Sequence, residues 1–166
     1  MASDPCAVAL LTELRQRGWT VGTAESLTGG LVAATIIDVS GASASMRGGI
    51  VAYDTRIKRE LLDVQGELLD AHGAVHPDVA RQMAEGVRRA LSVDGSPADV
   101  GLSTTGIAGP GSPDGQPVGL VYVGVATPHG YVGRRRVYEG TREEIRRQAS
   151  EEVLALALEA LETSAE

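Results

Sequence analysis

The sequence predicts an α/β fold, a three-layer α/β/α sandwich on a mixed parallel and antiparallel sheet. Helix-like and strand-like segments alternate through the first part of the chain, which is typical of parallel strands joined by crossover helices. Two strand-like runs between residues 118 and 140 then meet at "PHG", which indicates an antiparallel hairpin. Small residues dominate an apolar fraction of 43%, and they suit helices packed closely on a sheet.

Each element can be placed in order along the chain. The first helix has Asp4 as its cap, Pro5 in its first turn and Gly18 as its stop. Residues Val79, Met83 and Val87 recur every four positions, which is the inward face of a later helix. The predicted order is α-β-α-β-α-α-β-β-β-α, with helices at 4–18, 27–39, 55–64, about 79–91 and from about 141, and strands at 19–26, 48–54, 98–105 and two within 118–140.

Composition limits the class of protein and its partners. We expect residues 1–166 to form one domain with its own core. The net charge of −7 argues against nucleic acid as the main partner, because phosphate binding needs an excess of Lys and Arg. A local basic pocket for a small anionic ligand stays compatible with this charge.

The single cysteine and the absence of long apolar runs indicate a cytoplasmic protein. Cys6 cannot form an internal disulfide, and its place in an apolar helix pattern favours packing over chemistry. No signal sequence and no run long enough to cross a membrane is found, so we expect no membrane partner. The apolar helices make a homodimer plausible.

Three segments with unusual sequence follow predicted strands. They are "TAESLTGG" at residues 23–30, "AYDTRIK" at 52–58 and "STTGIAGPG" at 103–111. In open α/β sheets ligands bind beyond the carboxyl ends of the strands, where crossovers open a crevice. We therefore expect these three segments to converge on one site.

Ser26 in the first segment has both a functional and a structural interpretation. A hydroxyl between a strand and a helix can act as a nucleophile, with the helix amides stabilising negative charge nearby. Gly29 and Gly30 would let backbone approach a ligand. Alternatively, Ser26 or Thr28 caps the helix, and the glycines only allow tight packing.

A serine nucleophile needs a base, and the sequence offers few. His72, His76 and His129 lack the spacing of a triad or of a metal site, so they are most simply surface or capping residues. Lys58 is the only lysine and lies five residues after Tyr53, at the end of a predicted strand. It could act as a base if burial and nearby cations lowered its pKa by roughly two to three units. Each unit corresponds to a free-energy cost of about 1.4 kcal/mol. Otherwise it is a solvated helix residue.

A family resemblance bears on these alternatives. The motifs "TAESLTGG", "GGIVAYDTRIKRELLDV", "HGAVHPDVARQMAEGVRR", "TTGIAGPGSPDGQPVGLVYV" and "GTREEIRRQA" are similar in order and spacing to those of the CinA family's C-terminal domain. The resemblance covers about Val8 to Leu161. The family's N-terminal, molybdopterin-binding-like half has no counterpart here, so the chain resembles the stand-alone form.

The resemblance implies a nicotinamide-nucleotide amidase, which converts nicotinamide mononucleotide to nicotinic acid mononucleotide and ammonia without a metal or organic cofactor. By resemblance Ser26 is the nucleophile, Lys58 the general base, and Tyr53 a relay or positioning hydroxyl. Backbone amides from Thr28 to Gly30 would then hold the oxyanion.

The small nucleotide substrate implied by the resemblance would need a phosphate site. The loop from Thr105 to Gly111, including Gly106 and Gly109, is rich in glycine and suits presentation of amides to a ribose phosphate. Arg142, Arg146 and Arg147 could add positive charge, and Arg142 is the one we predict to bind substrate. These arginines could equally form a solvated face.

The sequence departs from the family at a few positions. Leu27 replaces a usual cysteine and is expected to pack, Thr55 replaces an asparagine near the lysine, and His76 stands at a probable helix cap. The alternative function is a non-catalytic nucleotide-binding regulatory module linked to competence or DNA-damage response. A different serine–lysine amidohydrolase is a second alternative.

Overall fold

A computed structural model describes residues 2–164, with only the backbone of Asp114. The α/β fold with a mixed sheet is confirmed. The helices are α1 Pro5–Arg17, α2 Leu31–Ile37, α3 Thr55–Leu62, α4 Gly66–His72, α5 Pro77–Ala90 and α6 Arg142–Thr163, and the strands are β1 Val21–Glu25, β2 Met46–Val51, β3 Val100–Gly106, β4 Leu120–Thr127 and β5 Gly130–Val137. Short 3₁₀ turns lie at Ala42–Ala44 and Pro113–Gly115.

The sheet has the strand order β2-β1-β3-β4-β5. Strand β1 lies at its parallel centre, paired with β2 on one side and β3 on the other. Strands β4 and β5 are antiparallel additions, joined by the predicted turn at residues 128–129. The carboxyl ends of β1, β2 and β3 therefore meet at one edge.

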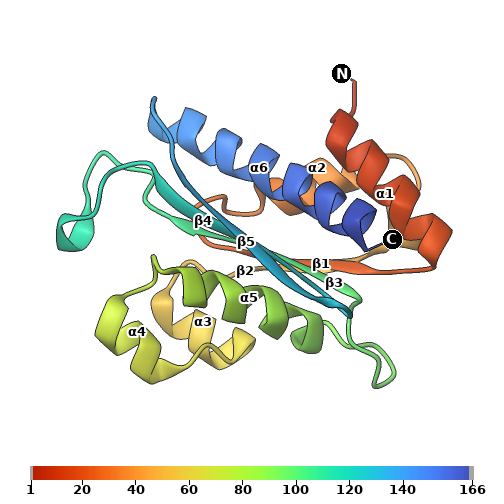
Figure 1. Ribbon diagram of the computed structural model, residues 1–166, viewed down its shortest axis with the longest axis horizontal. Coiled ribbons are helices and arrows are strands. Elements are labelled where there is room, and N and C mark those ends of the chain that lie inside the picture. The colour runs from red at the N-terminus through yellow and green to blue at the C-terminus, as the bar shows by residue number, and fades with distance from the viewer. Residues whose placement is uncertain (1, 165–166) are drawn as a thin grey trace.

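Helices cover both faces of the sheet (Figure 1). Helices α1, α2 and α6 lie on one face, and α3, α4 and α5 lie on the other. The larger apolar core lies under the first group, where Leu10, Leu14 and Leu156 are fully buried. A smaller core around Leu62 and Met83 lies under the second group. Cys6 packs against the larger core, in agreement with its predicted packing role.

Side-chain caps fix several helix ends where the sequence predicts them. Asp4 accepts a hydrogen bond from the Ala7 amide, and Gly18 ends α1 at φ 65°. The Nδ1 atom of His76 accepts a hydrogen bond from the Asp78 amide, so this histidine caps α5. These local signals were sufficient because a cap depends only on its neighbours in sequence.

Two helix predictions need correction. The segment 66–72 forms an additional helix, α4, and His72 is its last residue. The helix expected at 27–39 begins only at Leu31, with Gly29 and Gly30 before it at φ 62° and 103°. The two glycines thus form a left-handed turn between Ser26 and α2, a conformation that favours glycine.

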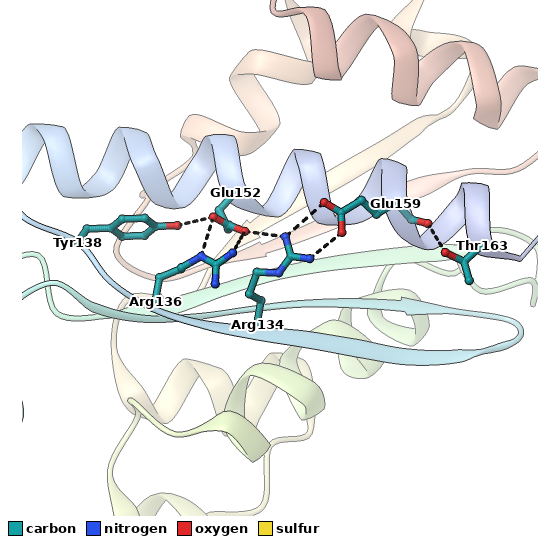
Figure 2. Close-up of polar contacts among 6 residues, drawn as sticks. All are labelled: Arg134, Arg136, Tyr138, Glu152, Glu159 and Thr163. Atoms are coloured by element: carbon teal, nitrogen blue, oxygen red, sulfur yellow. Dashed lines mark hydrogen bonds and ion pairs between the residues drawn. The ribbon is translucent and has the colours of Figure 1, made fainter.

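Strand β5 is an edge strand whose arginines are tied to α6 (Figure 2). Arg134 bonds both Glu152 and Glu159, at 2.8 and 2.6 Å, while Arg136 and the Tyr138 hydroxyl also bond Glu152. This network fixes α6 over the hairpin. No helix among residues 2–164 is both long and apolar enough to cross a membrane.

Candidate active site

The ends of the three parallel strands are joined by backbone hydrogen bonds. The Ser26 amide donates to the Thr104 carbonyl at 3.1 Å, and the Ala52 amide donates to the Glu25 carbonyl at 2.8 Å. Ser26 therefore lies between the end of β3 and the end of β2. The convergence expected from the order of the strands is present in the fold.

Ser26 and Lys58 meet at this edge although 32 residues separate them in sequence. The Lys58 Nζ atom lies 3.0 Å from Ser26 Oγ and donates to the Ala52 carbonyl at 2.7 Å. The Lys58 side chain is 1% exposed and that of Ser26 is 8% exposed. The two groups thus lie within hydrogen-bonding reach, while their catalytic roles stay a prediction.

Helix α3 places Lys58 on its inward face. Asp54 caps the helix by accepting from the Arg56 amide, and Lys58 and Leu62, four residues apart, are its buried positions. Burial lowers the pKa of Lys58 from its usual 10.5 to about 8, against the opposing effect of the negative charge on Asp54. The interpretation of Lys58 as a solvated helix residue is therefore wrong.

This pair has the arrangement that proton abstraction requires. A neutral amine can keep its hydrogen bond to the Ala52 carbonyl and use its lone pair to accept the Ser26 proton. With a pKa of about 8, about one lysine in ten is neutral at pH 7, against a few per ten thousand for a solvated lysine. A buried lysine with a lowered pKa is therefore chemically able to activate a neighbouring serine.

Ser26 opens into a cavity of about 190 Å³. Apolar side chains form much of its wall, and Tyr53 and Arg142 lie at its polar side. Its lining residues are Ser26, Leu27, Tyr53, Val75, Gly106, Ile107, Ala108, Gly109, Gly111, Pro113 and Arg142. Of the predicted site residues, the cavity therefore gathers Ser26, Tyr53, Gly106, Gly109 and Arg142, with Lys58 behind the serine.

Arg142 and Tyr53 meet beside the cavity. The Arg142 guanidinium donates to the Gly109 carbonyl at 2.6 Å and to the Tyr53 hydroxyl at 3.2 Å. Tyr53 is 62% exposed, and among residues 2–164 its hydroxyl has no hydrogen bond to Ser26 or Lys58. The Tyr53 hydroxyl is therefore held at the cavity by Arg142, and its role as a relay or positioning hydroxyl stays a prediction.

Two threonines expected to bind substrate turn away from the cavity. The Thr28 hydroxyl is buried and shares a 2.7 Å hydrogen bond with the Thr104 hydroxyl. The Thr105 hydroxyl donates to the Ala74 carbonyl, also at 2.7 Å. Side chains alternate along β3, so Thr105 faces the α5 side while the following Gly106 reaches the cavity.

The amides predicted to hold an oxyanion, from Thr28 to Gly30, are only partly free. The Gly29 amide donates to the Ser26 carbonyl at 3.1 Å, and the Gly30 amide donates to the Glu25 carboxylate, also at 3.1 Å. Among residues 2–164 the amides of Leu27 and Thr28 have no acceptor. The expected donor set therefore shifts towards the serine, to Leu27 and Thr28.

Glu25 is a residue for which the sequence analysis assigned no role. Its carboxylate is 1% exposed and accepts hydrogen bonds from the first amides of α2, those of Gly30, Val32 and Ala33, at 2.9 to 3.1 Å. It caps α2 in place of Ser26 or Thr28, so the capping alternative is wrong for those two residues. An acid just before a glycine turn and a helix was the available signal.

The other arginines near the amino end of α6 have different partners. Arg146 is half-buried and donates from Nε to the Leu27 carbonyl at 2.8 Å and from Nη2 to the Thr28 carbonyl at 3.1 Å. Arg147 is exposed and pairs with Glu151 at 3.0 Å. Only Arg142 of the three lines the cavity.

The remaining candidates lie elsewhere. His72 stacks on His76, and His129 lies against Trp19. No group of three metal-ligating side chains was found in the described part of the chain. Two larger cavities, of about 360 and 350 Å³, lie along β4 and β5 but contain neither Ser26 nor Lys58, so they do not carry this chemistry.

Two residues that depart from the family pattern, Leu27 and Thr55, lie in the core and at the surface. Leu27 packs into the larger core and touches the cavity, as the packing prediction required. Thr55 is exposed at the start of α3, outside the cavity lining. With Leu27 and Thr55 in place, Lys58 Nζ lies 3.0 Å from Ser26 Oγ.

Comparisons with known proteins agree with the fold and with the motifs. The family described as CinA C-terminal domain matches residues 3–161. A CinA-like protein of Anaeromyxobacter sp. (strain Fw109-5) is 45% identical over 93% of this chain and 37% of its own length. A protein of Caldanaerobacter subterraneus subsp. tengcongensis, whose name describes it as competence-damage inducible, is 50% identical over 80% of this chain and 31% of its own length.

Solved structures match over nearly the whole chain. The crystal structure of competence/damage inducible protein CihA from Agrobacterium tumefaciens gives a TM-score of 0.87 at 35% identity, covering 98% of this chain and 99% of that one. By contrast, the chain spans only about a third of the length of the curated relatives named above.

Proposed function

Because the chain belongs to the CinA family through its C-terminal domain, we propose that it is a nicotinamide-nucleotide amidase. The substrate is nicotinamide mononucleotide, and the products are nicotinic acid mononucleotide and ammonia. The observation that carries the proposal is the buried Lys58 amine 3.0 Å from the Ser26 hydroxyl at the wall of a cavity.

The reaction runs in two steps. In the first, Lys58 takes the proton of Ser26, the serine oxygen bonds to the carboxamide carbon, and the C–N bond breaks as the lysine passes that proton to the leaving nitrogen, which departs as ammonia. In the second, water attacks the resulting ester, the C–O bond to Ser26 breaks, and the serine regains its proton. The free amides of Leu27 and Thr28 would stabilise the oxyanion in both steps.

Support for an anionic substrate comes from the charges at the cavity. Among the described side chains, which do not include that of Asp114, Arg142 has no carboxylate partner within 4.0 Å. The loop amides of Ala108, Gly109 and Gly111 donate to no backbone carbonyl among residues 2–164. A cation beside free amides is the chemistry that binds phosphate, and the apolar wall suits a pyridine ring.

Ammonia release from nicotinamide mononucleotide tests the proposal. We expect activity in the wild type and a loss of about a thousandfold or more in Ser26→Ala and Lys58→Ala. Ser103→Ala is the matched control, because Ser103 is a buried serine that bonds Ala80 on the α5 side. Added hydroxylamine should divert the ester to the hydroxamate, which mass spectrometry detects.

The outcomes separate the alternatives. Tight nucleotide binding without ammonia would favour the regulatory module. Ammonia release that persists in both alanine variants would remove Ser26 and Lys58 from the mechanism.

A further inference from the structure

We propose that Arg146 is a positioning residue for the Ser26 turn, residues 26–29, and holds the Thr28 amide as an oxyanion donor. This inference rests on the proposed acyl-transfer chemistry, although its test does not depend on the substrate. Arg146 lies on α6, 118 residues from Thr28 in sequence, and reaches the turn with two nitrogens of one guanidinium.

The first three carbonyls of the turn, those of Ser26, Leu27 and Thr28, are occupied. The Ser26 carbonyl accepts from the Gly29 amide, the Leu27 carbonyl from Arg146 Nε, and the Thr28 carbonyl from Arg146 Nη2 and the Leu31 amide. The amides are not. In the described part of the chain, Leu27 and Thr28 supply the turn's two N–H groups that have no acceptor.

The contact to Leu27 determines where the Thr28 N–H points. The carbonyl of Leu27 and the amide of Thr28 belong to one planar trans peptide, so they point in opposite directions. A guanidinium fixed on the carbonyl therefore directs the N–H away from α6. The same charged hydrogen bond polarises the peptide unit and makes the N–H a stronger donor.

The local structure is built to admit this guanidinium. A Cβ atom at Gly29 would lie 3.3 Å from Arg146 Nη2, and the φ of 62° at Gly29 disfavours any side chain there. The Thr141–Glu144 capping box fixes the start of α6 one turn before Arg146. Arg146 therefore acts from a rigid helix onto a turn that leaves space for it.

Arg146 also differs from its two arginine neighbours in what it contacts. It has no carboxylate within 4.0 Å among the described side chains, and it does not line the cavity. Arg142 lines the cavity, and Arg147 forms an exposed pair with Glu151. The charge of Arg146 is thus directed at the turn and not at a ligand.

The test measures the reactivity of Ser26 directly. A fluorophosphonate forms a bond from Ser26 Oγ to phosphorus as the P–F bond breaks and fluoride leaves, with the serine proton passing to Lys58. Its phosphoryl oxygen occupies the oxyanion position. We expect labelling by the probe in Arg146→Ala to be ten- to a hundredfold slower than in the wild type, because a misdirected donor loses part of the roughly hundredfold or more that a well-placed oxyanion donor contributes.

Companion variants distinguish positioning from folding. Arg146→Lys keeps the charge but cannot bond both carbonyls in a fixed fork, so it should regain only part of the labelling rate. Millimolar guanidinium ion should partly restore Arg146→Ala and leave the wild type unchanged. Arg147→Ala is the matched control and should label at the wild-type rate.

Ammonia release measured in parallel separates this inference from the proposed function. We expect kcat to fall with the labelling rate in Arg146→Ala, with KM within about twofold of wild type. Labelling that depends on Arg146 without ammonia release would refute the substrate and keep the inference. Equal labelling of wild type and Arg146→Ala, or a loss matched by a lower melting temperature without guanidinium rescue, would overturn it. No labelling and no ammonia in the wild type would remove both.

Discussion

Helix α6 carries two clusters of charged residues that differ in how their charges are balanced. In its middle, Glu152 and Glu159 are paired with arginines of β5 (Figure 2). At its amino end, Arg142 and Arg146 bond carbonyl oxygens, as Lys58 does across the site. None of these three cations has a carboxylate within 4.0 Å in the described part of the chain.

The difference shows how one helix can serve both stability and chemistry. Paired charges satisfy each other and hold the edge strand to the helix, so they have little left to offer a ligand. Unpaired cations beside a cavity cost stability but leave positive charge available for a phosphate and an amine available as a base. Substitutions in the paired β5–α6 network and at the site cations measure how much each group contributes to stability and to activity.

The largest expected effect is the loss of activity at acid pH. Protonated Lys58 cannot accept the Ser26 proton, so kcat/KM should fall about tenfold per pH unit below the lysine pKa of about 8. The carboxylates of the β5–α6 network have pKa values below the usual 4.5 and stay charged throughout this range. A pH–rate profile recorded with melting curves should show lost activity with the fold intact. A flat profile would exclude Lys58 as the base.

Replacing Glu25 tests how much its buried carboxylate stabilises the start of α2 beside the Ser26 turn. Glu25→Ala would leave the amides of Gly30, Val32 and Ala33 without acceptors. Each unsatisfied amide costs about 1–3 kcal/mol, and water entering the space would offset part of this cost. We expect the free energy of unfolding to fall by about 3 kcal/mol or more, measured by denaturant titration. Glu25→Gln keeps one oxygen acceptor and should lose less.

Glu143→Ala is the matched control for Glu25, because Glu143 is an exposed glutamate in the first turn of α6. It should change the free energy of unfolding by less than about 0.5 kcal/mol. Equal losses in the two alanine variants would show that the buried contacts of Glu25 carry no special weight.

Much of the fold could be predicted because its signals are local or periodic. Caps at Asp4, His76 and Thr141 depend on neighbours, and the alternation of segments implied a parallel centre with an antiparallel hairpin. Helix α4 was missed because a seven-residue segment with one buried leucine, Leu69, has little periodicity. The start of α2 was misplaced because Glu25, outside the helix, sets it.

The candidate site was harder to predict because direction matters as much as position. Arg142 and Arg146, four residues apart, share a helix face, yet one turn of rise sends the first to the cavity and the second to the Ser26 turn. Thr105 and Gly106 are adjacent, but strand alternation turns the threonine away. Only the packed structure decides such directions.

Replacing Lys58 should reveal the cost of an unpaired cation. A pKa lowered from 10.5 to about 8 corresponds to about 3 kcal/mol of destabilisation at neutral pH. Lys58→Met fills similar space without charge, so we expect the free energy of unfolding at pH 7 to rise by about 1–3 kcal/mol while activity is lost. Denaturant titration and ammonia release measure the two effects.

The pH dependence of that gain fixes its cause. Between about pH 8 and 10.5 the unfolded wild type binds more protons at Lys58 than the folded protein, so wild-type stability should rise with pH across this window. Lys58→Met lacks this rise, and the two proteins should converge towards pH 10.5. A gain that is constant with pH would instead indicate better packing by methionine.

The smallest expected effect comes from the paired side of the contrast. Glu152→Gln weakens the bonds to Arg134, Arg136 and Tyr138, and should lower the free energy of unfolding by about 1–2 kcal/mol, because the network is partly exposed. Burial raises the pKa of Glu152, but the hydrogen bonds from Arg134, Tyr138 and Arg136 outweigh it and leave the pKa below 4.5. Its stabilisation is therefore complete above pH 4.5 and disappears as pH falls through the folded-state value.

Activity decides whether the two clusters are independent. Glu152 lies just under three turns after Arg142 on α6 and does not line the cavity, so kcat/KM of Glu152→Gln should stay within about twofold of wild type at pH 8. A double-mutant cycle with Arg134→Met, read by denaturant titration, should give a coupling energy of about 0.5–1.5 kcal/mol for the pair. A large loss of activity in Glu152→Gln would mean that the β5–α6 network holds α6 in the position that Arg142 and Arg146 need, and the separation of stability from chemistry along this helix would fail.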